Sequence, residues 1–271
     1  MQMSIDNYLD ENIKNILRIE FFDKIDSTNT HCKRLAASGE ADGYVAIAHS
    51  QTEGRGRLGR SFYSPKDTGL YMSILLRPDK MAPDHALRFT QLAAVSVAEA
   101  IEAILSLLPD DALEHIPEQE REQGAEQRKE RARAEAISIK WVNDILIEGK
   151  KVAGILVEGA CTGASFSAPF HGSSAGYTNE ALLEYAIVGI GVNVFEPEGG
   201  FPAEIKDTAS SIFEKRDVYQ DTADTIFEKL AAEIINRFYS NLLYKPFQYI
   251  LNKYAELCHD FPNVTHNRLK T

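Results

Sequence analysis

The sequence predicts an α+β fold in which one mixed β-sheet carries flanking helices. Segments rich in Val, Ile and Phe recur along the chain, and most are joined by hairpins and loops. Regular crossover helices, which would indicate a parallel α/β sheet, are not evident between them. With 271 residues, 44% of them hydrophobic, the chain can build one large domain or a domain with an appendage.

The first half of the chain begins with short strands and ends in a long helix. Three segments have strand-forming composition: 18–25, 44–50 and 70–78. The polar sequence DSTN at 26–29 has the side chains of a helix N-cap, so a helix is expected over 28–37. Residues 85–108 are rich in Ala and Leu and predict a long helix.

The second half contains a charged segment followed by further strands and helices. Residues 109–136 are half charged, with only Leu113 and Ile116 as large apolar side chains, so they predict an exposed insertion. The elements expected after it are paired strands over 137–147 and 150–159 around Gly149, a loop over 160–180, a strand over 185–195, and helices near 222–243 and 246–257.

Charge and composition restrict the class of partner. The formal charge of -11 repels nucleic acid and anionic membranes. The N-terminal residues lack an apolar signal segment, and no run approaches about 18 apolar residues. We therefore expect a cytoplasmic protein that binds neither nucleic acid nor membrane. Cys32, Cys161 and Cys258 are far apart in the sequence, which favours isolated thiols.

One stretch, EGRGRLGRSFYSP at 53–65, combines glycine and arginine. Its centre, GRGRLG at 54–59, matches the dinucleotide-binding pattern G-x-G-x-x-G. That pattern must open a helix, whereas Pro65 and Gly69 prevent a regular helix here and a strand follows. A Rossmann nucleotide site is therefore not expected.

Arg55, Arg57 and Arg60 give this stretch another interpretation. Glycines let the backbone wrap closely around a ligand, while guanidinium groups bind carboxylate and phosphoryl oxygens. Three like charges this close repel one another, so the loop should be mobile when empty and ordered over a bound polyanion. An incidental basic surface loop is the alternative.

Further motifs flank this stretch, which Gln51 precedes. They are DSTN at 26–29, GLYMS at 69–73, KWVND at 140–144, KVAGILVE at 151–158 and GIGVN at 189–193. In this order the motifs resemble the biotin protein ligase family, in the form without an N-terminal DNA-binding domain. The resemblance covers roughly residues 18–212.

The resemblance implies the biotin/lipoate protein ligase catalytic fold and a two-step reaction. Biotin and ATP, with Mg2+, would form biotinyl-5'-AMP, from which biotin would pass to a lysine of a biotin carboxyl carrier domain. This is the activity of a biotin–acetyl-CoA-carboxylase ligase. The family also allows a homodimer formed at a sheet edge. A lipoate or octanoate ligase and a catalytically weak biotin-binding protein are the alternatives.

Carried over position by position, the motifs imply two sets of ligand contacts. The residues expected to contact biotin are Ser27, Thr28, Asn29, Gln51, Arg55, Gly56, Arg57, Lys151, Gly189 and Gly191. Those expected to contact ATP are Arg57, Arg60, Trp141, Asn143 and Asn193. Hydroxyl and amide groups suit the ureido ring of biotin. Without the resemblance, DSTN is a helix cap, the strand glycines allow tight packing, and Trp141 is a core residue in a strand.

The resemblance also implies catalytic roles. Lys151 and Arg57 would neutralise the two anions that meet in the first step. Asp144 would assist the loss of a proton from the acceptor lysine, with Lys140 orienting the acceptor. Asp144 and Asn193 would hold Mg2+. Without the resemblance, Lys151 is a lysine of a turn.

Three features depart from the family pattern. Val142 stands where the family more usually has proline, which removes a fixed φ. Family members typically carry a small C-terminal β-barrel, for which too little chain follows the last predicted helix. About 17 residues precede the first strand, too few for a winged-helix DNA-binding domain. The expected organisation is a catalytic domain over 1–212 with C-terminal helices of the same domain over 213–271.

Overall fold

The computed structural model describes residues 5–107, 137–162, 164–167, 181–216, 223–258 and 260. The predicted insertion over 109–136 lies outside the described residues. Most of the predicted loop over 160–180 and the chain after residue 260 also lie outside them.

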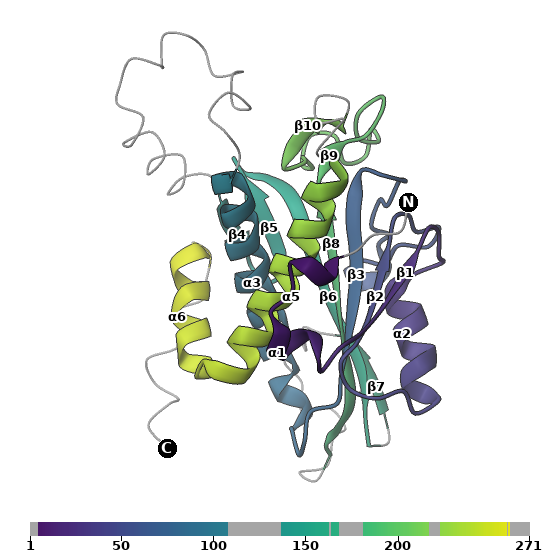
Figure 1. Ribbon diagram of the computed structural model, residues 1–271, viewed down its shortest axis with the longest axis vertical. Helices are drawn as coiled ribbons and strands as arrows, with labels where there is room; N and C mark the ends of the chain where they lie inside the picture. Colours follow the sequence, from purple (N-terminus) through teal and green to yellow (C-terminus); the bar gives the residue numbers. More distant parts are fainter. Residues whose placement is uncertain are drawn as a thin grey trace.

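A mixed sheet of eight strands forms the centre of the described fold (Figure 1). Its strands are β1 (Arg18–Phe22), β2 (Tyr44–Ala48), β3 (Gly69–Leu76), β4 (Ile137–Lys140), β5 (Asp144–Ile147), β6 (Lys150–Cys161), β7 (Ala164–Ser167) and β8 (Leu183–Asn193). They lie in the order β1-β2-β3-β8-β6-β5-β4, and β7 pairs with β6. β1 runs parallel to β2, and the other described pairings in this sheet are antiparallel, which confirms the predicted α+β class with a mixed sheet. A separate pair joins β9 (Phe195–Glu196) to β10 (Phe213–Lys215).

Helices pack on both faces of this sheet (Figure 1). The described α-helices are α1 (Glu11–Lys14), α2 (Thr28–Ala37), α3 (Ala86–Leu107), α5 (Ala223–Tyr244) and α6 (Phe247–Leu257). α2 contacts β2, β3 and β8, whereas α3 contacts β4, β5, β6 and β8 and packs against α5 and α6. The helices predicted near 28–37, 85–108, 222–243 and 246–257 are confirmed.

Helix α3 is the central apolar helix. The stretch Pro83–Ser106 is long and apolar enough to cross a membrane, by length and composition alone. However, 72% of its most apolar part is buried inside the protein, as in the core helix of a globular domain.

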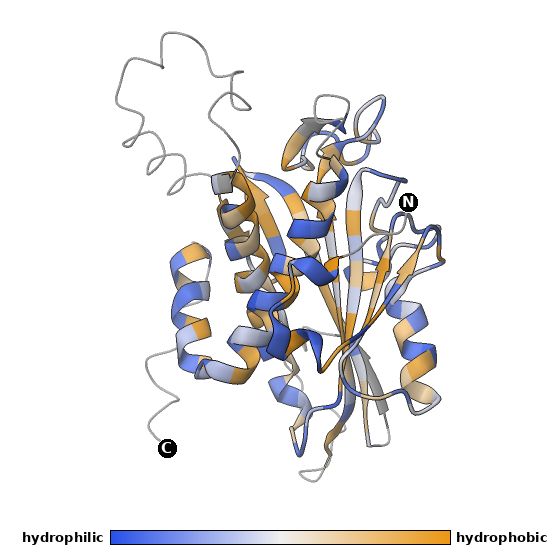
Figure 2. Ribbon diagram, viewed as in Figure 1, coloured by the Kyte–Doolittle hydropathy of each residue, from blue (hydrophilic) through white to orange (hydrophobic). Residues whose placement is uncertain are grey.

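Alternation along the strands divides the core between the two faces. In β2, Ile47 belongs to the large apolar cluster that includes α3, whereas Ala46 packs with Cys32 and Ala36 of α2 in a smaller cluster. Figure 2 shows hydrophobic residues concentrated along the strands and on α3. Since the α2 side carries the smaller cluster, part of the sheet on that side is available to form a site.

The strand predicted over 137–147 is wrong at its centre. The chain reverses there, so that β4 and β5 form an antiparallel hairpin in which Lys140 pairs with Asp144. The backbone N–H of Asn143 donates to Lys140 O at 3.2 Å and closes the turn. The KWVND motif therefore lies at a hairpin turn, and its polar side chains do not alternate along one strand.

The turn also changes the position of Trp141. This residue was expected within a strand, but it lies in the turn and packs edge-on against Tyr254 of α6, with ring centroids 6.0 Å apart. The peptide bond between Trp141 and Val142 is cis. Within the predicted loop over 160–180, the described residues include the end of β6 and strand β7.

Candidate active site

The floor of the site is formed by glycines on the α2 side of the sheet. Gly189 and Gly191 of β8 face this side, and Gly154 of β6 lies beside Gly191. A Cβ on Gly189 would lie 2.0 Å from Asn29 Oδ1, and one on Gly191 would lie 2.7 Å from the Phe62 ring. The glycines therefore allow side chains from two other segments to rest directly on the strands.

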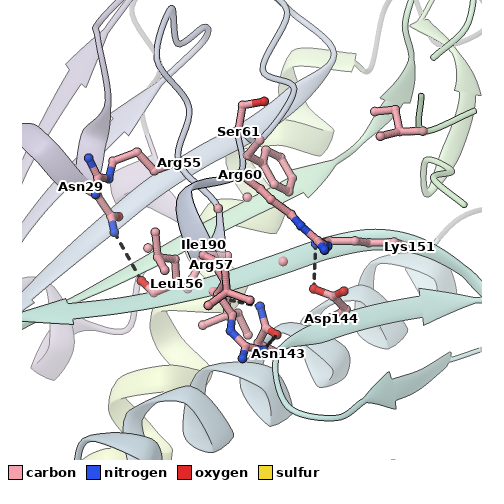
Figure 3. A pocket seen from close by; sticks show the side chains of 18 of the residues that line it. Asn29, Arg55, Arg57, Arg60, Ser61, Asn143, Asp144, Lys151, Leu156 and Ile190 are labelled. Carbon is pink, nitrogen blue, oxygen red and sulfur yellow. Dashed lines mark hydrogen bonds and ion pairs between the residues drawn. The ribbon is translucent and has the colours of Figure 1, made fainter. Parts of the chain in front are cut away.

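A cavity of about 500 Å³ opens above this floor (Figure 3). Its size is in the range of small-molecule sites. The predicted site residues that line it are Ser27, Thr28, Asn29, Gln51, Arg55, Gly56, Arg57, Arg60, Lys140, Asn143, Asp144, Lys151, Gly189 and Gly191. They come from α2, the arginine-rich loop, the β4–β5 hairpin and the strands β6 and β8. Most of the residues that the sequence predicted are therefore brought together.

One end of the cavity, here the polar end, is built from uncharged side chains. Its members are Ser27, Thr28, Asn29 and Gln51. Ser27 is the N-cap of α2 and also lines the cavity, so the two interpretations of DSTN hold together. Gln51 Oε1 accepts from the Thr28 backbone N–H at 2.9 Å. Asn29 Nδ2 donates to Glu158 Oε2 at 3.1 Å, which fixes the amide over the floor.

The arginine loop, residues 54–60, covers the cavity between its two ends. Its base is closed by the Phe62 backbone N–H, which donates to Gly54 O at 2.9 Å. Its tip is a single helical turn in which Leu58 has a φ of 56° and is 82% exposed. The loop therefore presents its tip to solvent and its flanks to the cavity.

Two of the three arginines have internal partners. Arg55 Nη2 donates to Glu158 Oε1 at 3.0 Å, and Arg57 Nη1 donates to Asn143 Oδ1 at 2.6 Å. The sequence predicted mutual repulsion and did not predict these partners. They come from β6 and from the β4–β5 turn, which are far from the loop in the sequence. The expectation that the empty loop is mobile stays a prediction.

The opposite end of the cavity, here the cationic end, gathers four basic side chains. They are Arg57, Arg60, Lys140 and Lys151. Lys151 Nζ lies 2.7 Å from Asp144 Oδ1. Figure 3 draws this ion pair and the nearby hydrogen bond between Arg57 and Asn143 as dashed lines. Burial lowers the pKa of Arg57, and its Nε is buried without a partner among the described residues. A guanidinium in this state is suited to an anionic ligand.

A buried carboxylate lies next to the polar end. Glu158 has a side chain that is 3% exposed and forms an ion pair of 2.7 Å with Lys33 of α2. Burial by itself raises the pKa of Glu158, but hydrogen bonds from Lys33 and Asn29 and the nearby charges bring the pKa below its usual value. Glu158 is therefore ionised at neutral pH.

Trp141 and Asn193 were expected at the ATP site, but they do not line this cavity. Trp141 packs against α6, as described above. Asn193 Nδ2 donates to Ser210 O at 2.9 Å and to Lys151 O at 3.5 Å. Asn193 thus braces the backbone beneath Lys151.

Several lining residues were not predicted. Phe62 lies over Gly154 and Gly191, and its ring centroid is 5.7 Å from Lys151 Nζ. Ile205 and Thr208 line the cavity from a segment in which no motif was recognised. Thr208 O accepts from the Lys151 backbone N–H at 2.8 Å, and this long-range contact has no local sequence signal.

The residues present offer Mg2+ few ligands. Within the described part of the chain, no group of three or more His, Cys, Asp or Glu side chains could hold a metal ion. Asp144 is the carboxylate among the lining residues, and its Oδ1 is paired with Lys151. This set fits a Mg2+ ion that is held mainly by phosphate oxygens and water, with one carboxylate from the protein.

Comparison with known sequences identifies relatives of this chain. The profile of the biotin/lipoate A/B protein ligase family matches residues 21–168. The bifunctional ligase/repressor BirA of Bacillus spizizenii is 33% identical over 190 residues, which make up 70% of this chain and 44% of that protein. The biotin–acetyl-CoA-carboxylase ligase of Mycobacterium tuberculosis is 27% identical over 214 residues, or 77% of this chain and 61% of that protein. The chain thus spans less than half of the length of the BirA relative.

Solved structures share the fold. The biotin protein ligase of Leishmania major in complex with biotinyl-5-AMP aligns with a TM-score of 0.60 at 20% identity, over 89% of this chain and 81% of that chain. The biotin protein ligase of Aquifex aeolicus in complex with biotin and ATP aligns with a TM-score of 0.55 at 25% identity, over 89% of this chain and 78% of that chain. Since the family profile also matches more than half of the sequence, the chain belongs to the biotin/lipoate A/B protein ligase family.

Proposed function

We propose that this chain attaches biotin to a lysine of a biotin carboxyl carrier domain, using ATP and passing through biotinyl-5'-AMP. The observation that carries the proposal is the two-ended cavity, with hydroxyl and amide groups at one end and Arg57 and Lys151 at the other. Biotin has a ureido ring and a carboxylate joined by an alkyl chain, which matches both ends. The named activities of the relatives, and the Aquifex aeolicus complex with biotin and ATP, support the same assignment.

In the first step a biotin carboxylate oxygen attacks the α-phosphorus of ATP, and the bond to pyrophosphate breaks. Two anions must approach each other, so positive charge at the point of contact lowers the barrier. Lys151 exchanges its partner Asp144 for the biotin carboxylate, and Arg57 turns its Nε, which has no partner among the described residues, toward the phosphate. Asp144 is the carboxylate that would hold a Mg2+ ion on the phosphates, and the ion would supply further positive charge beside the departing pyrophosphate.

In the second step the amine of the acceptor lysine attacks the carbonyl carbon of the adenylate, and AMP leaves. The acceptor must arrive as a neutral amine, so its ammonium proton has to be removed. Asp144 lies at the cavity wall, 28% exposed at its side chain, and accepts this proton at a carboxylate oxygen. Lys140 is exposed at the same turn, where it would meet the approaching carrier domain.

The polar end favours biotin over lipoate. The dithiolane ring of lipoate has no hydrogen-bonding N–H or C=O group, so it would cover buried polar side chains without matching them. Ser27, Thr28 and Asn29 are 1%, 3% and 4% exposed, which makes such a mismatch costly. A ureido ring offers two N–H donors and one carbonyl acceptor to the same groups.

Exchange of radiolabelled pyrophosphate into ATP tests the proposal. Biotin-dependent exchange is expected, with transfer of biotin to a carrier domain in a second assay. Lys151→Met and Arg57→Ala should each reduce exchange by about 100-fold or more, whereas Lys150→Met at the exposed neighbouring position should not change it. Exchange that depends on lipoate alone would transfer the assignment to a lipoate ligase. Biotin binding without exchange would leave a biotin-binding protein.

A further inference from the structure

Glu158 occupies an unusual position for a carboxylate. It lies in β6, two residues after Leu156, and pairs with Ile187 of β8. Leu156 itself pairs with Gly189 on the floor of the site. The side chain of Glu158 is 3% exposed and faces the α2 side of the sheet, where it contacts Asn29 and Arg55, two residues that line the cavity. Burial of a charge is costly unless the charge is paired and hydrogen-bonded. Glu158 must therefore be matched by its surroundings.

Two elements meet on this carboxylate. Helix α2 supplies Lys33, whose Nζ is 2.7 Å from Oε1, and Asn29, whose Nδ2 is 3.1 Å from Oε2. The arginine loop supplies Arg55, whose Nη2 is 3.0 Å from Oε1. Together with its own strand β6, Glu158 thus joins the sheet, the helix and the loop.

The side chain of Arg55 points toward the polar end of the cavity. In Figure 3 it lies beside Asn29, whereas Arg57, Lys151 and Asp144 gather at the opposite end. Arg55 is therefore not placed to meet a phosphate in this arrangement. Its guanidinium has a carboxylate partner, and charge-assisted pairs of this kind are about twice as strong as neutral hydrogen bonds.

We infer that Glu158 is a positioning residue that holds the arginine loop closed over the polar end, and that the Arg55 side chain serves this closure instead of binding the ligand. The inference deepens the proposed function and rests on it. A loop held at Arg55 encloses the ureido ring and slows its escape. The same contact keeps Arg57, two residues along, at the cationic end.

The test uses Glu158→Gln, which keeps the shape and removes the charge, and Arg55→Met, which changes a side chain that is 47% exposed and spares the core. Limited trypsin digestion of the ligand-free protein reports loop opening through cleavage after Arg57 and Arg60. Both variants should be cleaved roughly tenfold faster than the wild type and release biotin faster by a similar factor. Glu40→Gln, which breaks an ion pair with Arg18, should behave as the wild type.

Three further comparisons separate the explanations. The double variant Glu158→Gln/Arg55→Met should be no faster than either single variant, because one contact is lost in all of them. Lys33→Met should stay near the wild-type cleavage rate, since the pair with Arg55 remains. The inference would be overturned if pyrophosphate exchange were slower in Arg55→Met but ran at the wild-type rate in Glu158→Gln. Unchanged cleavage in both variants would also overturn it.

The two proposals can fail separately. A wild-type protein without biotin-dependent exchange contradicts the proposed function. The cleavage comparison between Glu158→Gln and Glu40→Gln needs no substrate, so it reports on loop closure in either case.

Discussion

A Cβ at Gly189 would disturb a tightly held amide. In Gly189→Ala the new atom would lie 2.0 Å from Asn29 Oδ1, where an ordinary contact needs at least 3.4 Å. Asn29 cannot move freely, because Ser73 Oγ donates to Oδ1 at 2.6 Å and Nδ2 is bonded to Leu156 O and Glu158. Overpacking costs about 1–3 kcal/mol and a broken buried hydrogen bond about 1 kcal/mol. Gly189→Ala should therefore lower the free energy of unfolding by about 2–4 kcal/mol.

Thermal unfolding and calorimetric titration with biotin measure the effect. The unfolding temperature should fall by roughly 5–15 °C, and biotin affinity should fall by about 100-fold, because the displaced amide is part of the polar end. Gly191→Ala is the matched control on the same strand, because its Cβ would meet the ring of Phe62. The Phe62 side chain is half-buried and lies near the loop, so it can move, and Gly191→Ala should lose less stability than Gly189→Ala. A wild-type unfolding temperature and biotin affinity in Gly189→Ala would refute this reasoning, as would a greater loss of stability in Gly191→Ala.

Three other changes have definite expected results. Tyr254→Phe removes a hydroxyl that donates to Val142 O at 2.8 Å, so urea denaturation should show an unfolding free energy lower by about 1 kcal/mol. Tyr239→Phe is the control, because its buried hydroxyl has no partner among the described residues, and it should leave the unfolding free energy unchanged. The pKa of Glu158 lies below its ordinary value of 4.5. The contribution of the ionised carboxylate to stability is therefore complete above pH 4.5 and is lost as the pH falls through the lowered pKa. Glu158→Gln should flatten the dependence of the unfolding free energy on pH in that acidic range. Asn143→Ala removes the amide that donates to Ile155 O at 2.8 Å and fixes the turn at the cationic end, so ATP binding should weaken about tenfold in a fluorescence titration.

Local composition was sufficient for most of the fold. The helix over 28–37 has a polar N-cap and the helix over 85–108 has a long apolar pattern, and both signals lie within the segment itself. The break at 141–143 could not be predicted in this way, because Ile, Trp, Val and Leu surround it and suit a strand. What fixes the turn is tertiary, since Asn143 Nδ2 donates to Ile155 O at 2.8 Å in the next strand.

The candidate site was predictable in its members and not in its pairings. The motifs placed the lining residues correctly because their spacing follows the ends of strands and the start of a helix. Sequence spacing does not show which charges meet, and Arg55 and Glu158 are 103 positions apart. Trp141 packs against Tyr254 and Asn193 donates to Ser210 O, so neither lines the cavity, and their expected contact with ATP stays a prediction.

The partners of the two anchored arginines differ in a way that separates their roles. Arg55 is bound to a buried carboxylate, and leaving it would remove one of the two cations that compensate this charge inside the protein. Arg57 is bound to a neutral amide, which it can leave at lower cost when an anion enters the cavity. Only one glycine lies between them, so a loop fixed at Arg55 keeps Arg57 near the cationic end while Arg57 changes partners. A charged anchor beside a weakly held cation is the arrangement that binding and releasing an anionic substrate requires.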